Sequence, residues 1–277
     1  MHKHAVLALV LTHLRLKPAA FRVIDVHAGG GLYDLYAPEP MRTGEWREGI
    51  ARVWEAARAG AFPPALAPYL KVIEAFNPGG VLRFYPGSPA IAAHFLRRQD
   101  RLIACEIEPA AAASLKKSLR RRVNAKAIVI DGWMALGAYV PPKERRGLVL
   151  IDPPFEEVAD FGRLPGVLSG AYGKWPNGIY MLWYPIKDRA APDALAKRLQ
   201  ETSIGNMLRC ELMFGPPDDA DGLAGSGVII VNPPFTLERD LRKSLPALGT
   251  ILSARSSVRI DRLARQGLNR PPGADRR

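Results

Sequence analysis

Short apolar runs that end in a polar or acidic residue recur along this chain, and helical patterns separate most of them. The runs are continuous and do not alternate, which is typical of strands buried on both faces of a sheet. They cover residues 21–26, 102–106, 127–131, 147–152, 178–184, 207–214 and 227–231. Helical periodicity lies between them, for example over residues 109–122 and 192–202. This order predicts an α/β fold built on a seven-stranded, mainly parallel sheet.

One interval breaks this rhythm. Residues 32–101 separate the first two predicted strands, and a simple crossover needs far fewer residues. Residues 43–76 have helical periodicity with a proline-rich break. We therefore predict that residues 32–101 form a helical insertion subdomain with a return loop, over the carboxyl edge of the sheet where ligands bind in open α/β folds. The main domain would comprise residues 1–31 and 102–252, and a basic, partly disordered tail would cover 253–277.

The beginning of the chain combines charge with a short apolar run. Leu7, Leu11 and Leu14 fall on one helical face, which predicts an amphipathic core helix. The apolar run is too short for a signal peptide and no cleavage site follows it. No stretch of the sequence is long and apolar enough to span a membrane.

The cysteines and several tryptophans lie in apolar surroundings. Cys105 and Cys210 are predicted to be buried thiols, because a disulfide framework or a zinc site needs more ligands at suitable spacing. Trp54, Trp175 and Trp183 are assigned to the core or to an interface. Together these features favour a reducing compartment, which is the cytoplasm, and no metal site.

The charge balance points to a polyanionic partner. The formal net charge is +12 and the isoelectric point is about 10.0. Lys and Arg clusters gain affinity for nucleic acid by releasing counterions from phosphates. The most concentrated basic run, residues 116–122, lies on the helix predicted after the second strand. It is either a solvated face or an RNA-phosphate contact, and both interpretations stay open.

Polar residues follow three successive predicted strands in a particular order. The first strand runs into the glycine-rich stretch DVHAGGG, where glycines such as Gly29 let the backbone approach a ligand. Glu106 ends the second strand and can accept hydrogen bonds from ribose hydroxyls. Asp131 and Gly132 end the third, where the carboxylate can bind an adenine amine or cap the next helix. In this order the three ends predict a nucleotide-like cofactor lying across the edge of the sheet.

The fourth strand ends in Asp152-Pro153-Pro154-Phe155, which is the most specific signal in the chain. Prolines lack a backbone N–H group and fix the local conformation, so their carbonyls remain free to accept. The Asp152 carboxylate and the Pro153 carbonyl can together bind one exocyclic amine and aim its lone pair. Phe155 offers a face on which a flipped base can stack. A proline-stiffened turn is the structural alternative, and the three preceding strand ends favour catalysis.

A second stretch, Asn232-Pro233-Pro234-Phe235, offers the same chemical groups. Chain order distinguishes the two. The strand that ends at Asp152 follows the cofactor strands directly and should lie beside the first strand. Asn232 comes several elements later, so we expect it nearer an edge of the sheet, as a structural turn.

Taken together, the chain resembles the RlmJ family of 23S ribosomal RNA adenine-N6 methyltransferases, which are also described as involved in the use of external DNA. The matching stretches are DVHAGGG, RTGEWREGIARVW, LRFYPGSP, EIEP, DGW, RRGLVLIDPPF, GIYMLWYP and GSGVIIVNPPF, and they extend from about Lys3 to Leu237. The resemblance implies a Rossmann-like class I methyltransferase fold with a helical insertion after the first strand.

The resemblance also implies roles for individual residues. S-adenosylmethionine would be the cofactor, Asp152 the catalytic residue with Pro153 and Phe155, and 23S rRNA the partner, through an unpaired or hairpin adenine and with no obligate protein partner. Phe155 stands where tyrosine is commoner, so that only a hydroxyl is lost. The expected cofactor contacts are His4, His27, Gly29, Ser88, Glu106, Asp131, Gly132 and Asp152, of which His4 carries no signal of its own and would otherwise be assigned to the surface.

The sequence departs from the family at its beginning. Members carry a further N-terminal segment with a YRH…FHAGN pattern that is thought to help close the site, and this chain starts at Met1-His2-Lys3-His4. The resemblance therefore supports S-adenosylmethionine binding more strongly than turnover, and both a start codon assigned too late and a real truncation stay open. Two alternative functions also stay open: a DNA adenine-N6 methyltransferase, and a non-catalytic nucleic-acid-binding protein if the short N-terminus is real.

Overall fold

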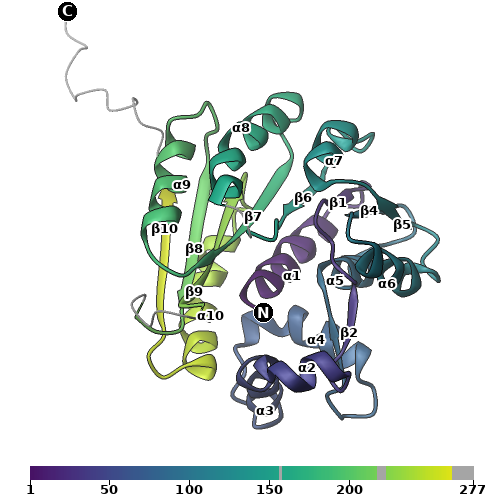
Figure 1. Ribbon diagram of the computed structural model, residues 1–277, viewed down its shortest axis with the longest axis vertical. Coiled ribbons are helices and arrows are strands. Elements are labelled where there is room, and N and C mark those ends of the chain that lie inside the picture. Colours follow the sequence, from purple (N-terminus) through teal and green to yellow (C-terminus); the bar gives the residue numbers. More distant parts are fainter. Residues whose placement is uncertain (156–157, 217–222, 264–277) are drawn as a thin grey trace, which may run out of the picture.

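An eight-stranded sheet in the order β10-β8-β9-β7-β6-β1-β4-β5 forms the centre of the molecule (Figure 1). The computed structural model describes residues 1–155, 158–216 and 223–263. Each of the seven predicted strands is present within a few residues of its expected position. The eight strands of the sheet are β1 (Arg22–Asp25), β4 (Arg101–Glu106), β5 (Ala125–Val129), β6 (Gly147–Ile151), β7 (Ile179–Ile186), β8 (Met207–Met213), β9 (Gly225–Val231) and the unpredicted β10 (Ser257–Leu263).

Strands β5, β4, β1, β6 and β7 run parallel, so the predicted α/β fold with a mainly parallel sheet is confirmed. Strand β9 enters between β7 and β8 and is antiparallel to both. The predicted number of seven strands is wrong, because β10 pairs with β8 in antiparallel orientation.

Strand β10 falls within residues 253–277, which we expected to form a basic tail. Its Val258 and Ile260 pack against the core, while the intervening Arg259 and Asp261 take part in ion pairs. An edge strand with charges on one face looks like a polar tail in sequence. Residues 264–277, the rest of the predicted tail, lie outside the described residues.

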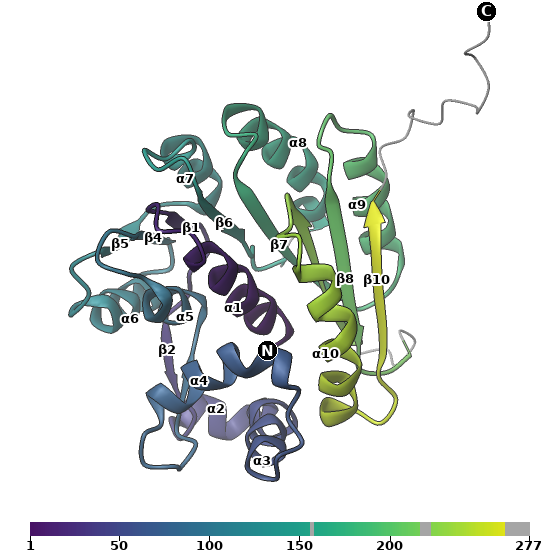
Figure 2. The same cartoon turned by 180° about the vertical axis from the view of Figure 1, so that it is seen from behind.

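Two helical layers cover the sheet (Figure 2). One layer contains α1 (His2–Arg15), α5 (Ser88–Phe95), α6 (Pro109–Leu119) and α10 (Leu237–Leu252), and the other contains α7 (Gly132–Tyr139), α8 (Val158–Lys174) and α9 (Ala190–Gln200). The expected core helix at the start of the chain is α1, which is buried along most of its length and contacts α5. None of the helices in the described ranges is long and apolar enough to cross a membrane.

The chain between β1 and β4 forms a mainly helical unit. Strands β2 (Leu32–Asp34) and β3 (Phe84–Pro86) pair with each other, and the sequence did not predict them. Between them lie α2 (Pro38–Thr43), a π-helical turn η1 (Arg47–Ala51), α3 (Arg52–Arg58), a 3-10 turn η2 (Pro64–Leu66) and α4 (Ala67–Phe76). This unit contacts the main body where α4 meets α1 and where α3 meets α10. It therefore lies beside the N-terminal helix, which also leads to the site described next.

Candidate active site

The carboxyl ends of three adjacent parallel strands, β4, β1 and β6, bring Glu106, Asp25 and Asp152 to one edge of the sheet. In the register, Asp25 lies opposite Ala104 of β4 and Leu150 of β6. The polar strand ends that are far apart in the sequence therefore converge, as expected for parallel strands that share one carboxyl edge.

The first loop is tied to the end of β4 by a backbone hydrogen bond. The Gly29 N–H donates to Oε2 of Glu106 at 2.8 Å, and Gly29 has a φ of 63°, a conformation that favours glycine. The other oxygen, Oε1, accepts from the amides of Ile107 and Glu108. Glu106 is thus a fixed carboxylate whose Oε2 retains acceptor capacity toward the edge of the sheet.

His27 and Gly132 meet where the first loop approaches the start of α7. A Cβ atom on Gly132 would lie 2.3 Å from Nε2 of His27 and 2.4 Å from the Val26 carbonyl oxygen, so only glycine fits. Asp131 caps α7 by accepting a hydrogen bond from the Met134 N–H at 2.9 Å. One carboxylate oxygen of Asp131 therefore caps the helix, as one of the two interpretations expected. The close approach of His27 and the Val26 carbonyl explains why glycine follows Asp131 at position 132.

Asp152 is bound from two sides. Its backbone N–H donates to Nδ1 of His27 at 3.4 Å, which requires an unprotonated Nδ1, and burial lowers the pKa of His27 accordingly. Its carboxylate forms an ion pair with the ammonium of Lys3, and both side chains are largely shielded from solvent. Lys3 comes from the first turn of α1 and was not singled out from the sequence.

Aromatic rings line the other side of the motif. Phe155 has a φ of 56°, which is unusual outside glycine, and its ring centroid lies 4.7 Å from Phe161 and 5.8 Å from Trp183. Trp183 is only partly buried. Ile151 of β6 pairs with Leu182 of β7, so the next residues along the two strands, Asp152 and Trp183, lie at the same level. Trp183 packs against the core, in line with its assignment to the core or to an interface, and it also borders the candidate site. Its Nε1 donates to Ser226 Oγ at 2.8 Å, and the Lys3 ammonium lies 5.6 Å from its ring centroid.

His4 and Ser88 are both buried beside this edge. His4 is not the surface residue that its own sequence context suggested, because it is 7% exposed and its Nδ1 lies 2.7 Å from the Tyr85 hydroxyl. Tyr85 in turn lies 3.1 Å from the hydroxyl of Tyr69 on α4. Burial holds the pKa of His4 well below its usual range. Ser88 begins α5, immediately after Gly87, whose N–H donates to the Gly31 carbonyl.

Asp25 is a buried acid that the sequence reasoning passed over. Its side chain is fully buried, and neither carboxylate oxygen has a hydrogen-bond partner among the described residues. Burial raises the pKa of Asp25 to about 7, and the nearby Ser88 side chain, Lys3 and the His27 backbone oppose this shift only in part. A buried, unsatisfied carboxylate at the end of β1 is costly unless something else uses it. The available signal was the acid that immediately precedes the glycine-rich loop.

The second proline motif lies where the parallel strands begin, at the opposite strand ends from Asp152. Strand β9 runs antiparallel to β7, so its last residue adjoins the beginning of β7, and Nδ2 of Asn232 donates to the carbonyls of Pro176 and Gly178 at 2.8 Å each. As expected, Asn232 follows a strand that lies nearer an edge strand than β6 does, since β9 is third from the β10 side of the sheet and β6 is fourth from the β5 side. The antiparallel direction of β9 also places Asn232 at the opposite ends of the strands from Asp152.

A large cleft opens next to the start of α1. It has a volume of about 940 Å³ and is lined by residues of the helical unit and of the C-terminal half, among them Met1, Trp46, Tyr85, Phe214 and Leu252. Tyr85 thus contacts both the cleft and His4. Within the described ranges, no group of His, Cys, Asp and Glu side chains is arranged to hold a metal ion.

Comparisons with known proteins agree on one family. A family model described as ribosomal RNA large subunit methyltransferase D, RlmJ, matches residues 18–262. Curated proteins called ribosomal RNA large subunit methyltransferase J from Haemophilus influenzae and Escherichia coli are each 39% identical to this chain, over 247 and 246 residues; both alignments cover 89% of this chain and 87% of the relative. A crystal structure of a Legionella pneumophila protein of the DUF519 family superposes with a TM-score of 0.86 at 33% identity, covering 94% of this chain and 95% of the other.

Proposed function

The chain belongs to the RlmJ family of ribosomal RNA large subunit methyltransferases, and we propose that it transfers a methyl group to the exocyclic amine of an adenine in 23S rRNA. The family resemblance inferred from the sequence motifs is confirmed by these comparisons. Membership makes the chain a methyltransferase with S-adenosylmethionine as methyl donor. It does not favour the two alternatives, a DNA methyltransferase and a non-catalytic binder.

The residues at the edge of the sheet fit this cofactor. Asp25 offers a buried carboxylate without a partner, which suits a cationic amino group. Oε2 of Glu106 has acceptor capacity for ribose hydroxyls, and the contact between Gly132 and His27 leaves a side-chain-free surface at the start of α7. We assign the remaining contacts to His4, Ser88, Gly29 and Asp131. When bound, S-adenosylmethionine supplies the electrophilic methyl group.

The observation that carries the proposal is the arrangement around Asp152. Its carboxylate lies at the carboxyl edge, held by Lys3, with Phe155 and Trp183 beside it. A carboxylate next to a proline carbonyl can accept both hydrogens of one exocyclic amine, and the aromatic faces suit a planar base. Asp152 can also receive the proton that the amine loses on methylation. Lys3 acts as a positioning residue that fixes the carboxylate.

We further propose that the target adenine is unpaired or lies in a hairpin, because such a base costs less to extrude. The cleft beside Met1 is the route that we favour for the RNA strand, since it adjoins Tyr85 and α1. No feature of the described residues calls for an obligate protein partner. The rRNA substrate and the two free cysteines favour the cytoplasm as its location.

Transfer of a tritiated methyl group from S-adenosylmethionine to deproteinised large-subunit RNA tests this function. We expect the wild type to label the RNA and Asp152→Ala to lose the labelling while keeping its fold, even at saturating S-adenosylmethionine. Equal labelling by both proteins would contradict the assignment of Asp152.

The two alternatives need their own measurements. Competing DNA and RNA substrates at one fixed salt concentration separate a DNA methyltransferase from an RNA methyltransferase, because affinities for both depend on salt. A non-catalytic binder would retain RNA on a filter without transferring methyl groups. We expect preferential labelling of RNA.

A further inference from the structure

Basic residues gather at the edge of the sheet opposite the candidate active site. The four adjacent strands β5, β4, β1 and β6 begin at this edge. Arg101 and Arg22 begin β4 and β1, Arg146 precedes β6, and Lys126 is the second residue of β5. The C-terminal end of α1 adds to the same edge, because Arg146 donates to the Leu14 carbonyl. We use the name basic pole for its exposed members Arg98, Arg101, Arg120, Arg121, Arg122 and Lys126.

The acidic side chains at the basic pole are already engaged. Asp100 is fully buried and binds Arg97, while Glu144 binds Arg22 through two hydrogen bonds of 2.6 and 3.0 Å. By contrast, no ion pair joins Arg101 or Lys126 to an acid in the described part of the chain, although Nη1 of Arg101 donates to the carbonyls of Arg98 and Asp100 at 2.8 Å each. Their positive charge is therefore available to a ligand.

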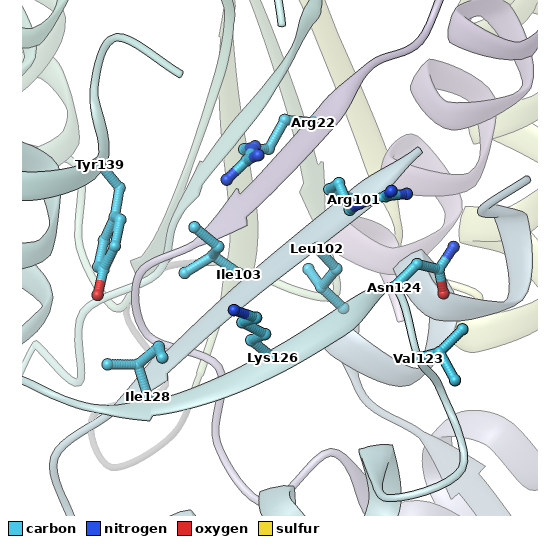
Figure 3. A pocket seen from close by; sticks show the side chains of 9 residues that line it. All are labelled: Arg22, Arg101, Leu102, Ile103, Val123, Asn124, Lys126, Ile128 and Tyr139. Carbon is cyan, nitrogen blue, oxygen red and sulfur yellow. The ribbon is translucent and has the colours of Figure 1, made fainter. Parts of the chain in front are cut away.

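A groove of about 400 Å³ adjoins the basic pole and is lined by two of its members, Arg101 and Lys126, together with Arg22 (Figure 3). Arg101 and Lys126 line it, with Lys126 in the middle of the lining residues, and the apolar side chains of Ile103 and Ile128 lie beside Lys126. Tyr139, at the end of α7, forms one side. Helix α7 ends at Tyr139 beside this part of β4 and β5, and the side chains of Arg101 and Lys126 are exposed there.

We propose that the basic pole and its groove bind a single-stranded segment of the RNA substrate, away from the target adenine. This inference rests on the proposed function. The cations that line the groove suit phosphates, and its apolar side chains beside an aromatic ring suit an unstacked base, which a fully paired helix does not offer. An acidic protein surface would match the charge equally well, but the groove, which is the size of a nucleotide, favours RNA.

The spacing explains why such a contact matters for a large substrate. Strand β4 has six residues, so the two edges are about 20 Å apart at about 3.3 Å per residue. A trinucleotide at the active site cannot reach the basic pole, whereas a folded rRNA fragment can occupy both. The basic pole should therefore raise the affinity for long RNA and leave the chemical step unchanged.

The test compares two variants that each lose three positive charges. Arg101→Gln, Arg122→Gln and Lys126→Gln are combined in the pole variant, and Lys197→Gln, Arg198→Gln and Lys243→Gln, on α9 and α10, form the matched control. Fluorescence anisotropy measures the Kd for a labelled rRNA fragment and for a trinucleotide at several salt concentrations. Methyl transfer at saturating RNA gives kcat. The single variant Lys126→Gln guards against misfolding, because this side chain is exposed and β5 is an edge strand.

We expect the pole variant to weaken binding of the long RNA by about tenfold and to lower the slope of log Kd against log salt by about 2, since each phosphate contact on a single strand contributes about 0.7. Trinucleotide binding and kcat should stay at wild-type values, and Lys126→Gln should show a smaller loss in the same direction. Equal weakening by the control variant, or wild-type affinity in the pole variant, would overturn the inference. The binding measurements need no turnover, so a protein that binds RNA through the basic pole but transfers no methyl group would contradict only the proposed function.

Discussion

The ammonium of Lys3 is ion-paired with the carboxylate of Asp152, although the two residues are 149 positions apart in the chain. The pair joins the first turn of α1 to the end of β6. It also brings a positive charge next to the ring of Trp183, which borders Phe155. The N-terminal helix is therefore part of the candidate site as well as part of the core.

Removing the positive charge of Lys3 should impair methyl transfer more than cofactor binding. Without its partner, the Asp152 carboxylate is free to turn away from the incoming amine, and we expect Lys3→Gln to lower kcat by about a hundredfold, as for other positioned groups. Lys3→Arg should retain more activity because it keeps the charge. Single-turnover methyl transfer and calorimetric titration with S-adenosylmethionine make the comparison. A normal kcat in Lys3→Gln would contradict the role.

Replacing Trp183 should weaken the binding of RNA more than the binding of the cofactor. Its ring forms a wall beside Phe155 and is held by Ser226, so Trp183→Ala is expected to raise KM for RNA by about tenfold through lost stacking. Trp183→Phe keeps an aromatic face and should recover most of that loss. The steady-state KM for RNA and the Kd for S-adenosylmethionine are the measurements. An equal loss in both variants would indicate a packing role and not a stacking role.

The second proline motif should matter for stability and not for chemistry. Nδ2 of Asn232 makes two hydrogen bonds to the start of β7, and its φ of 52° suits asparagine better than alanine. We expect Asn232→Ala to lower the free energy of unfolding by about 2 kcal/mol. Denaturant titration measures this change, and the activity of the folded fraction should equal that of the wild type. A large loss of kcat at full folding would show that the motif takes part in the reaction.

Much of this arrangement could be predicted from the sequence. The continuous apolar runs located the strands, and their order placed Asp152 beside the cofactor strands, because successive parallel strands share one carboxyl edge. The direction of β9 could not be predicted, since the run GVIIV looks the same in parallel and antiparallel strands. Because β9 is antiparallel to β7, Asn232 lies where the parallel strands begin, opposite Asp152.

Other features depend on contacts that no local pattern records. Lys3 is one lysine among many until α1 packs across the sheet and delivers it to Asp152. Trp183 has the same apolar neighbours as a core residue, and only the register between β6 and β7 shows that it reaches the edge. Strand β10 was not predicted because its charged residues give it the appearance of a polar tail. Their partners lie on neighbouring elements, as Arg209 does for Asp261, and no local pattern shows them.

The buried carboxylate of Asp25 should make stability depend on pH. Its pKa is raised from 3.8 to about 7, so between these values the folded chain holds a proton that the unfolded chain has lost. Stability therefore falls as pH rises through this window, and the loss is complete above about pH 7. Asp25→Asn removes this contribution. Its gain in free energy of unfolding over the wild type should be about 2 kcal/mol larger at pH 8 than at pH 5.

Denaturant titrations of both proteins at the two pH values, without cofactor, measure the effect. The same variant should bind S-adenosylmethionine more weakly, because the carboxylate is no longer available to a cationic amino group. A stability gain that is equal at both pH values would contradict the raised pKa.

The central claim is that Asp152 directs a methyl group to adenine N6 in ribosomal RNA. The most direct measurement is mass spectrometry of nucleosides from 23S rRNA that has been incubated with the protein and S-adenosylmethionine and then digested. We predict N6-methyladenosine after incubation with the wild type and with Asn232→Ala, and none with Asp152→Ala. A methylated nucleoside other than N6-methyladenosine, or N6-methyladenosine formed equally well by Asp152→Ala, would contradict it.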